Sequence, residues 1–242
     1  MIYKSLDNNY IKQLKKLQQK KYRDQMHEFL IETPHLVTEA YNAGCLKQLI
    51  VEENTVFDLK VDSIKVAKKV IDYLSQLKSS NNVMGLGSYN ENKQIEGNKI
   101  LILDNIQDPG NLGTIIRSAV AFNIDTIILS KDSVDIYNSK VLRASQGMVF
   151  HINIIIGDLL KIIPELKRQH FKIVTTKVAT GGRLKDFSKT LKFAIIMGNE
   201  GNGISKEIQE ISDEFLHIDI SKKCESLNVA IATSIILYEI SR

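Results

Sequence analysis

The stretch "KILILDNIQDPGNLGTIIRSA", residues 99–119, combines an apolar run, a polar turn and the start of a helix. The run "KILIL" is typical of a strand that is buried on both faces of a parallel sheet. The turn contains Pro109 and Gly110, and we expect a helix that begins around Asn111 and covers residues 112–122. In open α/β sheets, ligands bind beyond the carboxyl ends of the strands. The polar side chains of this turn are therefore candidate functional groups.

The same alternation continues to the end of the chain. Further strands are expected in "DTIILS", "HINIII", "FKIVTTKV", "KFAIIMG" and "EFLHIDI". Further helices are expected at residues 159–169, at 205–210 and from Ser226 onward. Strands that alternate with helices predict an α/β fold with a mostly parallel sheet and helices on both faces.

The first part of the chain predicts a smaller α/β unit. We expect helices at residues 11–23 and 63–77 and strands in "LKQLIVEE" and "NVMGLGSY". A third helix has Thr33 as its N-cap, Pro34 at its first position and Gly44 as its stop signal. The polar stretch "NENKQIEGNK" is the best linker, which predicts two domains, residues 1–95 and 96–242.

The composition, 43% hydrophobic and 25% charged residues, is typical of a soluble globular protein. The chain contains no apolar run of the roughly 20 residues that a membrane span needs. Its beginning lacks the apolar segment of a signal peptide. Cys45 and Cys224 form neither a disulfide framework nor a metal-binding pattern. We therefore expect a reduced, cytoplasmic protein that binds no metal.

The net charge of +4 is unevenly distributed. The segment "KQLKKLQQKKYR", residues 12–23, carries six basic residues and no acidic one. Two interpretations remain open here, an ordinary solvated helix face and a patch that contacts nucleic-acid phosphates. The candidate RNA-binding residues in this segment are Lys12, Lys16, Lys20 and Arg23.

Two further loops carry candidate functional residues. In "FAIIMGNEGNGIS", residues 193–205, three glycines surround Glu200 in a strand-to-helix turn. Their order differs from that of a dinucleotide-binding loop, and a carboxylate in the turn disfavours a phosphate and suits a neutral or cationic ligand. In "CESLNVAIATSIILYE", residues 224–239, Ser226 is the expected N-cap of a largely apolar helix and Asn228 lies in its first turn. Asn111 is the expected N-cap of the helix in the first loop.

The three loops together resemble the sequence motifs of the SpoU (TrmH-like) branch of the SPOUT RNA methyltransferases. "DNIQDPGNLGTIIRSA" is similar to the first motif, "IIMGNEGNGIS" to the second and "IDISKKCESLNVAIATSIILYE" to the third. The resemblance covers residues 99–242. The N-terminal part is more loosely similar to the ribosomal-protein-like substrate-binding domain of that family, with Thr33-Pro34 where relatives commonly have a glycine.

The resemblance implies transfer of a methyl group from S-adenosylmethionine to a ribose 2′-hydroxyl of RNA. It also implies a trefoil knot in the parallel-sheet domain, a homodimer formed through that domain, and no need for a metal. Five residues match catalytic positions: Asn111, Arg117, Glu200, Ser226 and Asn228. Six match positions around the cofactor: Thr176, Met197, Gly198, Gly203, Ile218 and Leu227.

The role of Arg117 stays open at this point. Arginine is effectively always protonated, so a phosphate clamp is as compatible with the sequence as a proton acceptor. Ribosomal RNA is the first choice of substrate and transfer RNA the alternative. A non-catalytic RNA-binding protein on the same scaffold is a rival hypothesis. A nucleotide-dependent enzyme is another, although no P-loop lysine follows the glycines of residues 198–203.

Overall fold

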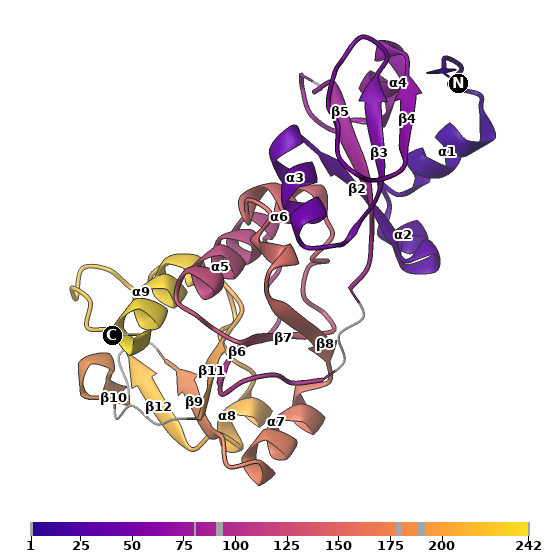
Figure 1. The fold of residues 1–242 in the computed structure, drawn as a ribbon. Helices are drawn as coiled ribbons and strands as arrows, with labels where there is room; N and C mark the ends of the chain where they lie inside the picture. Colours follow the sequence, from indigo (N-terminus) through magenta and orange to yellow (C-terminus); the bar gives the residue numbers. More distant parts are fainter. Residues whose placement is uncertain (1, 80, 91–93, 178–180, 188–191, 242) are drawn as a thin grey trace. The chain divides into compact units, whose positions relative to one another are not determined.

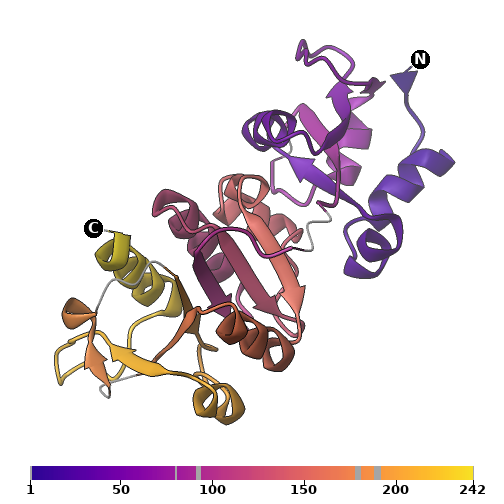
Figure 2. The same ribbon diagram turned by 60° about the horizontal axis from the view of Figure 1, so that its bottom comes forward.

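A computed structural model describes the chain except for residues 1, 80, 91–93, 178–180, 188–191 and 242. The chain divides into two compact units, shown in Figures 1 and 2. Unit 1 contains Met1–Glu91 and Asp135–His151, and unit 2 contains Asn92–Val134 and Ile152–Arg242. The return of Asp135–His151 to unit 1 is not evident from the sequence. The domain boundary between residues 95 and 96 stays a prediction, and residues 91–93 of the linker lie outside the described residues.

Unit 2 is built on a parallel sheet whose described strands have the order β10-β12-β9-β11-β6-β7-β8. All of its described pairings are parallel. The strands are β6 (Lys99–Leu103), β7 (Thr126–Ser130), β8 (Asn153–Gly157), β9 (Lys172–Thr176), β10 (Gly182–Arg183), β11 (Phe193–Met197) and β12 (Glu214–His217). Six of these strands agree with those predicted from the sequence, and the two-residue β10 was not predicted.

Helices cover both faces of this sheet, as predicted (Figure 1). On one face lie α5 (Pro109–Ala121) and α9 (Val229–Ser241), joined by a 2.7 Å hydrogen bond between the hydroxyl oxygens of Ser118 and Ser234. On the other lie α7 (Leu159–Arg168) and α8 (Lys206–Glu210). None of the helices in the described part of the chain has the length and apolar character that a membrane span requires.

The apolar runs form strands because both faces of each strand are covered. In β6, Ile100 and Ile102 belong to the core cluster that α7 and α8 complete. Leu101 and Leu103 point to the opposite face, since successive side chains of a strand alternate, and they are fully buried too. A strand with two covered faces keeps no polar side, which explains why the sequence shows a continuous apolar run.

Unit 1 contains a mixed sheet of order β1-β4-β3-β5-β2 among its described residues. The strands are β1 (Ile2–Tyr3), β2 (Glu28–Glu32), β3 (Leu46–Glu52), β4 (Ser63–Val66) and β5 (Val83–Ser88). The helices are α1 (Asn9–Lys16), α2 (Lys20–Met26), α3 (Pro34–Asn42), α4 (Lys68–Leu74) and, from the returning segment, α6 (Ser139–Ala144) with the 3-10 turn η1 (Met148–Phe150). The predicted boundaries of α3 are confirmed, and the Thr33 hydroxyl accepts from the Leu36 N–H at 3.3 Å.

Two predictions for unit 1 were wrong. The expected helix at residues 11–23 is interrupted between α1 and α2, and the Arg23 guanidinium donates to the Leu17 carbonyl at 2.9 Å in the gap. The expected helix at residues 63–77 begins only at Lys68. The preceding "SIKV" instead forms β4 between β1 and β3, where its β-branched residues suit a strand.

Candidate active site

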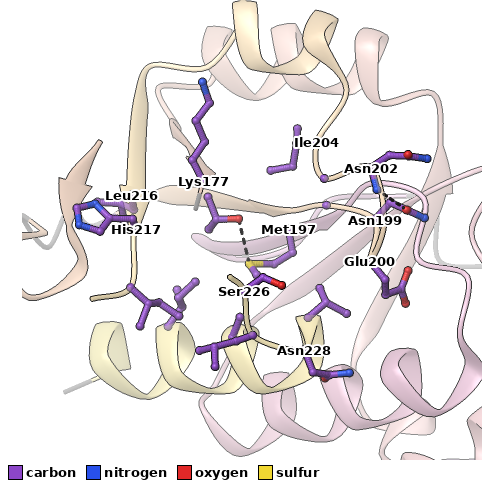
Figure 3. A pocket seen from close by; sticks show the side chains of 18 of the residues that line it. Lys177, Met197, Asn199, Glu200, Asn202, Ile204, Leu216, His217, Ser226 and Asn228 are labelled. Carbon is purple, nitrogen blue, oxygen red and sulfur yellow. Dashed lines mark hydrogen bonds between the residues drawn. The ribbon is translucent and has the colours of Figure 1, made fainter. Parts of the chain in front are cut away.

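The second and third motif loops of unit 2 line a cavity of about 590 Å³ (Figure 3). Its lining comes from the ends of β9, β11 and β12, from the glycine turn and from the entrance of α9. Nine residues of the predicted site line it: Thr176, Met197, Gly198, Glu200, Gly203, Ile218, Ser226, Leu227 and Asn228. The cavity thus lies at the carboxyl edge of the parallel strands, where open α/β sheets bind their ligands.

The turn after β11 requires glycine at two positions. Two backbone hydrogen bonds between Asn199 and Gly203, of 2.9 and 3.0 Å, close the turn. A Cβ atom at Gly198 would lie 2.4 Å from the Gly203 carbonyl carbon. Gly203 has a φ of +69°, a conformation that L side chains rarely adopt. The glycines therefore shape the wall of the cavity.

Glu200 projects from this turn toward the start of α5. Its carboxylate accepts weak hydrogen bonds from the backbone N–H groups of Gln107 at 3.5 Å and Asp108 at 3.4 Å. The Asn111 Nδ2 atom donates to it at 3.0 Å. The N-terminus of a helix carries partial positive charge, so this position favours an ionised carboxylate.

Asn111 and Asn228 extend the hydrogen bonding to the third loop. The Asn228 Nδ2 atom donates to Asn111 Oδ1 at 3.0 Å. The Asn228 Oδ1 atom accepts from the N–H groups of Ala230 at 2.9 Å and Ile231 at 3.3 Å. Each amide thus donates through nitrogen and accepts through oxygen. The result is a directional chain from the N-terminus of α9 to the carboxylate of Glu200, and it joins all three loops.

The structure corrects the predicted helix caps. Asp108, not Asn111, is the N-cap of α5, since its carboxylate accepts from the Asn111 N–H at 2.8 Å. Asn228, not Ser226, caps α9, while Ser226 lies exposed ahead of the helix. The side chain of Asn111 is consequently available for Glu200 and Asn228, which a cap at Asn111 would have precluded.

The surroundings of Glu200 keep it ionised. Partial burial raises its pKa, but the hydrogen bonds from Asn111 and from the backbone of residues 200, 108 and 107 outweigh that effect. The pKa therefore lies below the ordinary value of 4.5. Glu200 is an anion at neutral pH and acts as a hydrogen-bond acceptor rather than as a proton donor.

Arg117 lies exposed on α5. Of the five candidate catalytic residues, Glu200, Ser226 and Asn228 are among the described residues that line the cavity, whereas Asn111 and Arg117 are not. Glu200 and Asn228 lie on one side of the cavity and His217 at the opposite end (Figure 3). The structure thus brings Asn111, Glu200 and Asn228 into direct contact, and Ser226 lines the cavity without a hydrogen bond to these three described residues.

The candidate RNA-binding residues of unit 1 differ in their exposure to solvent. Lys12, Lys16 and Lys20 are exposed on α1 and α2. Lys12 forms an ion pair with Asp7, and Lys20 forms one with Asp24. Arg23 is only 5% exposed and forms a buried ion pair with Asp135. The prediction that Arg23 contacts RNA is therefore wrong, because the break between α1 and α2 turns its side chain inward.

Several residues of the site were not predicted. Asn199 donates through Nδ2 to the Asn105 carbonyl at 2.8 Å and so links the second loop to the first. Its Oδ1 accepts from the N–H groups of Gly201 and Asn202. Lys177 and His217 line the cavity as well. The repeated Asn-x-x-Asn pattern in "GNEGNG" was the available signal for Asn199, since asparagine often stabilises turns in this way.

No group of three or more potential metal-binding side chains occurs among the residues that the structure describes.

Comparisons with known proteins match both units. The model of the SpoU rRNA methylase family matches residues 98–238, and that of the MRM3-like substrate binding domain matches residues 8–85. A similar protein in Bacillus subtilis, the 23S rRNA (guanosine(2553)-2'-O)-methyltransferase RlmP, is 33% identical, covering 98% of this chain and 97% of its own. An uncharacterized tRNA/rRNA methyltransferase of Borreliella burgdorferi is 38% identical over 62% of this chain and 66% of its own.

Solved structures show the same architecture. An rRNA methyltransferase from Sinorhizobium meliloti bound to AdoMet has a TM-score of 0.86 at 28% identity, covering 99% of this chain and 97% of that one. A putative RNA methyltransferase of the TrmH family from Porphyromonas gingivalis has a TM-score of 0.88 at 27% identity, with 98% of each chain covered. The family match spans more than half of the chain and contains all the described residues that line the cavity. The chain belongs to the SpoU rRNA methylase family.

Proposed function

We propose that this enzyme transfers the methyl group of S-adenosylmethionine to a ribose 2′-hydroxyl of ribosomal RNA. The observation that carries the proposal is the hydrogen-bonded chain Glu200–Asn111–Asn228, which joins the three motif loops beside the cavity. The similarity to RlmP along nearly the whole chain favours 23S rRNA, and the guanosine that its name specifies is the first nucleotide to test. A cytoplasmic location and the trefoil knot around the cavity are parts of the same proposal.

The cavity suits S-adenosylmethionine. Its walls combine apolar side chains such as Leu227, Ile218 and Met197 with backbone polar groups of the glycine turn, a composition typical of cofactor sites. The bound cofactor supplies an electrophilic methyl group on a positively charged sulfur. The ionised carboxylate of Glu200 at the cavity rim is compatible with that charge, whereas it would repel a phosphate.

The residues of this chain mainly position the acceptor. A ribose hydroxyl is a weak nucleophile that must approach the methyl carbon in line with the departing sulfur. Alignment of the reacting groups alone lowers the activation barrier by roughly 7–11 kcal/mol in favourable intramolecular reactions. The Asn111 amide is oriented by Glu200 on one side and by Asn228 on the other. Ser226 lines the cavity, and in this proposal its hydroxyl hydrogen-bonds to the incoming ribose.

Arg117 acts as a phosphate clamp in this proposal. Its side chain is exposed on α5, two turns beyond the Asp108 cap, and its guanidinium is a two-pronged donor that matches a phosphate. Its permanent positive charge disfavours a role as proton acceptor. Lys12, Lys16 and Lys20 supply further phosphate contacts from unit 1.

We also propose a homodimer formed through unit 2. Ile231, Ile235 and Tyr238 on α9 are 54%, 39% and 50% exposed, and their spacing places them on one stripe of the helix. An apolar stripe of this kind favours burial against a second copy. Sedimentation equilibrium is expected to give twice the chain mass, and Ile235→Asp to give a monomer. A monomeric wild-type protein at micromolar concentration contradicts this part of the proposal.

The proposed function is tested by incubating the protein with labelled S-adenosylmethionine and unmodified 23S, 16S and transfer RNA transcripts. We expect label in 23S rRNA as a 2′-O-methyl group, mapped to one nucleotide. Arg117→Ala is expected to abolish transfer, and Arg117→Lys to restore little, since lysine cannot form the two-pronged contact. Label in transfer RNA instead redirects the substrate assignment. RNA binding without transfer to any transcript supports a non-catalytic protein.

A further inference from the structure

Arg23 forms a buried ion pair with a residue more than a hundred positions away. Its Nε donates to Asp135 Oδ2 at 2.9 Å, its Nη2 contacts the same oxygen, and its Nη1 donates to the Leu17 carbonyl at 2.9 Å. The two side chains are 7% and 9% exposed. A buried ion pair seldom stabilises a fold more than apolar residues of the same size would, so a role in specifying geometry is a reasonable expectation.

Asp135 begins the segment that returns to unit 1. Two residues later, the ring of Tyr137 stacks on Phe29 of β2 and on Tyr89, with centroid distances of 4.4 and 4.1 Å. The Tyr89 hydroxyl in turn donates to Asp24 of α2 at 3.1 Å. The segment is therefore attached directly to α2 by an ion pair, and indirectly by the aromatic stack through Tyr89.

The residues just before Asp135 hold the catalytic loop of unit 2. The Val134 N–H donates to the Ile106 carbonyl at 2.8 Å, and the Ile106 N–H donates to the Ser133 hydroxyl at 3.2 Å. The Asn105 N–H donates to the Ser130 hydroxyl at 2.8 Å. Residues 130–134 thus clamp the backbone directly ahead of Gln107 and Asp108, whose N–H groups face Glu200.

We propose that Arg23 and Asp135 are positioning residues for methyl transfer. The peptide bond from Val134 to Asp135 carries the chain from one unit into the other. On one side of that bond, Arg23 anchors the chain to α2, the helix that also bears Lys20. On the other side, residues 130–134 fix the loop that orients Asn111 through Glu200. Arg23 thus fixes one end of residues 130–135, the other end of this stretch fixes the catalytic loop, and the rate of transfer depends on both anchors. The inference rests on the proposed function.

The first test replaces Asp135 by Asn, which keeps the volume of the side chain and removes its charge. We expect kcat at saturating RNA and cofactor to fall about tenfold or more, since displacement of catalytic groups by 1 Å can cost about 10²-fold. The KM for RNA and the Kd for S-adenosylmethionine should change less than twofold. The matched control is Glu39→Gln, which weakens the contact with His151 at the other end of the same segment, and there kcat should stay within twofold.

A double-mutant cycle separates positioning from general destabilisation. Ser133→Ala removes the acceptor for the Ile106 N–H and should lower kcat in the same way. Combined with Asp135→Asn, it should lower kcat no further than the more severe single variant, because both break one connection. If Asp135→Asn does not fold, Arg23→Met/Asp135→Leu removes both charges and takes its place, with the same loss of kcat expected at an unchanged melting temperature.

Three results overturn the inference: an effect confined to KM, multiplicative effects of the two substitutions, or an equal loss in Glu39→Gln. These outcomes differ from a failure of the proposed function. In that case the wild-type protein transfers no methyl group to any RNA, whereas the inference is judged only on variants of an active wild type.

Discussion

Two helices of this protein begin in nearly the same way, α3 in unit 1 and α5 in unit 2. Each follows a buried strand, each has proline in its first turn, and each has a side-chain N-cap, Thr33 for α3 and Asp108 for α5. A glutamate lies beside each local structure. Glu32, directly before Thr33, is 5% exposed and accepts from the Ser75 hydroxyl at 2.6 Å and the Gln76 N–H at 3.1 Å.

The difference lies in where the second glutamate comes from. Glu200 reaches the start of α5 from a loop about ninety residues further along the chain and stays at the rim of a cavity. The carboxylate of Glu32 instead links the end of β2 to the residues directly after α4, within unit 1. The same local pattern therefore gives a structural joint in one unit and a candidate catalytic site in the other. The deciding factor is the tertiary contact and not the helix start.

The largest effect is expected at the glycine turn that delivers Glu200. In Gly198→Ala, the new methyl group would lie 2.4 Å from backbone, so the turn must open. We expect binding of S-adenosylmethionine, measured by calorimetry, to weaken by about 10²-fold or more, given that overpacking alone typically costs about 1–3 kcal/mol. Gly201→Ala is the control, since its nearest neighbour would be Asn199 Oδ1 at 3.6 Å and no strain arises. Similar binding by both variants contradicts the prediction.

A smaller but still large effect is expected for Asn111→Asp. The new carboxylate faces Glu200, repels it and cannot donate to it, so the hydrogen bond between residue 111 and Glu200 is lost, while the Asn228 amide can still donate to residue 111. We expect kcat to fall by about 10²-fold, the usual magnitude for loss of one well-placed donor in an active site. Asn123→Asp, an exposed position at the far end of α5, is the matched control and should retain its rate. Equal rates in the two variants would show that Asn111 has no positioning role.

The ionisation of Glu200 predicts a pH dependence. Its pKa is depressed below 4.5 in the folded state, so ionised Glu200 stabilises the fold above that ordinary value. The contribution is lost as the pH falls through the lower, folded-state pKa. We expect the difference in unfolding free energy between wild type and Glu200→Gln to be constant from pH 6 to 8 and to shrink below about pH 4.5. A difference that changes near neutral pH is the opposing result, and urea titrations at each pH measure it.

The smallest effect is expected at Thr33, the N-cap of α3. Thr33 has a φ of +94°, which is a strained conformation for a β-branched residue but is accessible to glycine without steric strain. Thr33→Gly should raise the free energy of unfolding by about 1 kcal/mol, because release of strain exceeds the few tenths that a glycine cap costs. Thr33→Ala keeps the strain and loses the cap, so it should lower the free energy of unfolding. Thermal or urea unfolding of the pair decides the sign, and stabilisation by alanine would exclude the strain argument.

The sequence predicted most of the sheet in unit 2 because its strands are buried on both faces and show continuous apolar runs. The same reasoning misplaced two elements of unit 1. "SIKV" became a strand because β1 and β3 lie beside it, and the basic helix broke because Arg23 found Asp135 far along the chain. Neither partner is visible in a local window of sequence.

The candidate site shows the same division. Asn111, Glu200 and Asn228 were identified from motifs, and the structure brings them within hydrogen-bonding distance. Their local roles were misjudged, since capping preferences alone cannot distinguish Asn111 from Asp108 or Ser226 from Asn228. Only the geometry of the assembled loops shows which side chain caps a helix and which is left to contact a neighbouring loop.

By itself, the sequence of this protein determined the α/β class, the strands of the parallel sheet, the glycine turn and the family. Each of these depends on short-range features, namely apolar periodicity, backbone freedom at glycine and motif spacing. The tertiary structure alone decided that residues 135–151 return to unit 1, that Arg23 is buried, and that one chain of amides joins the three loops. These features depend on contacts between residues about 90 to 120 positions apart, which form only when the sheet brings the ends of its strands together.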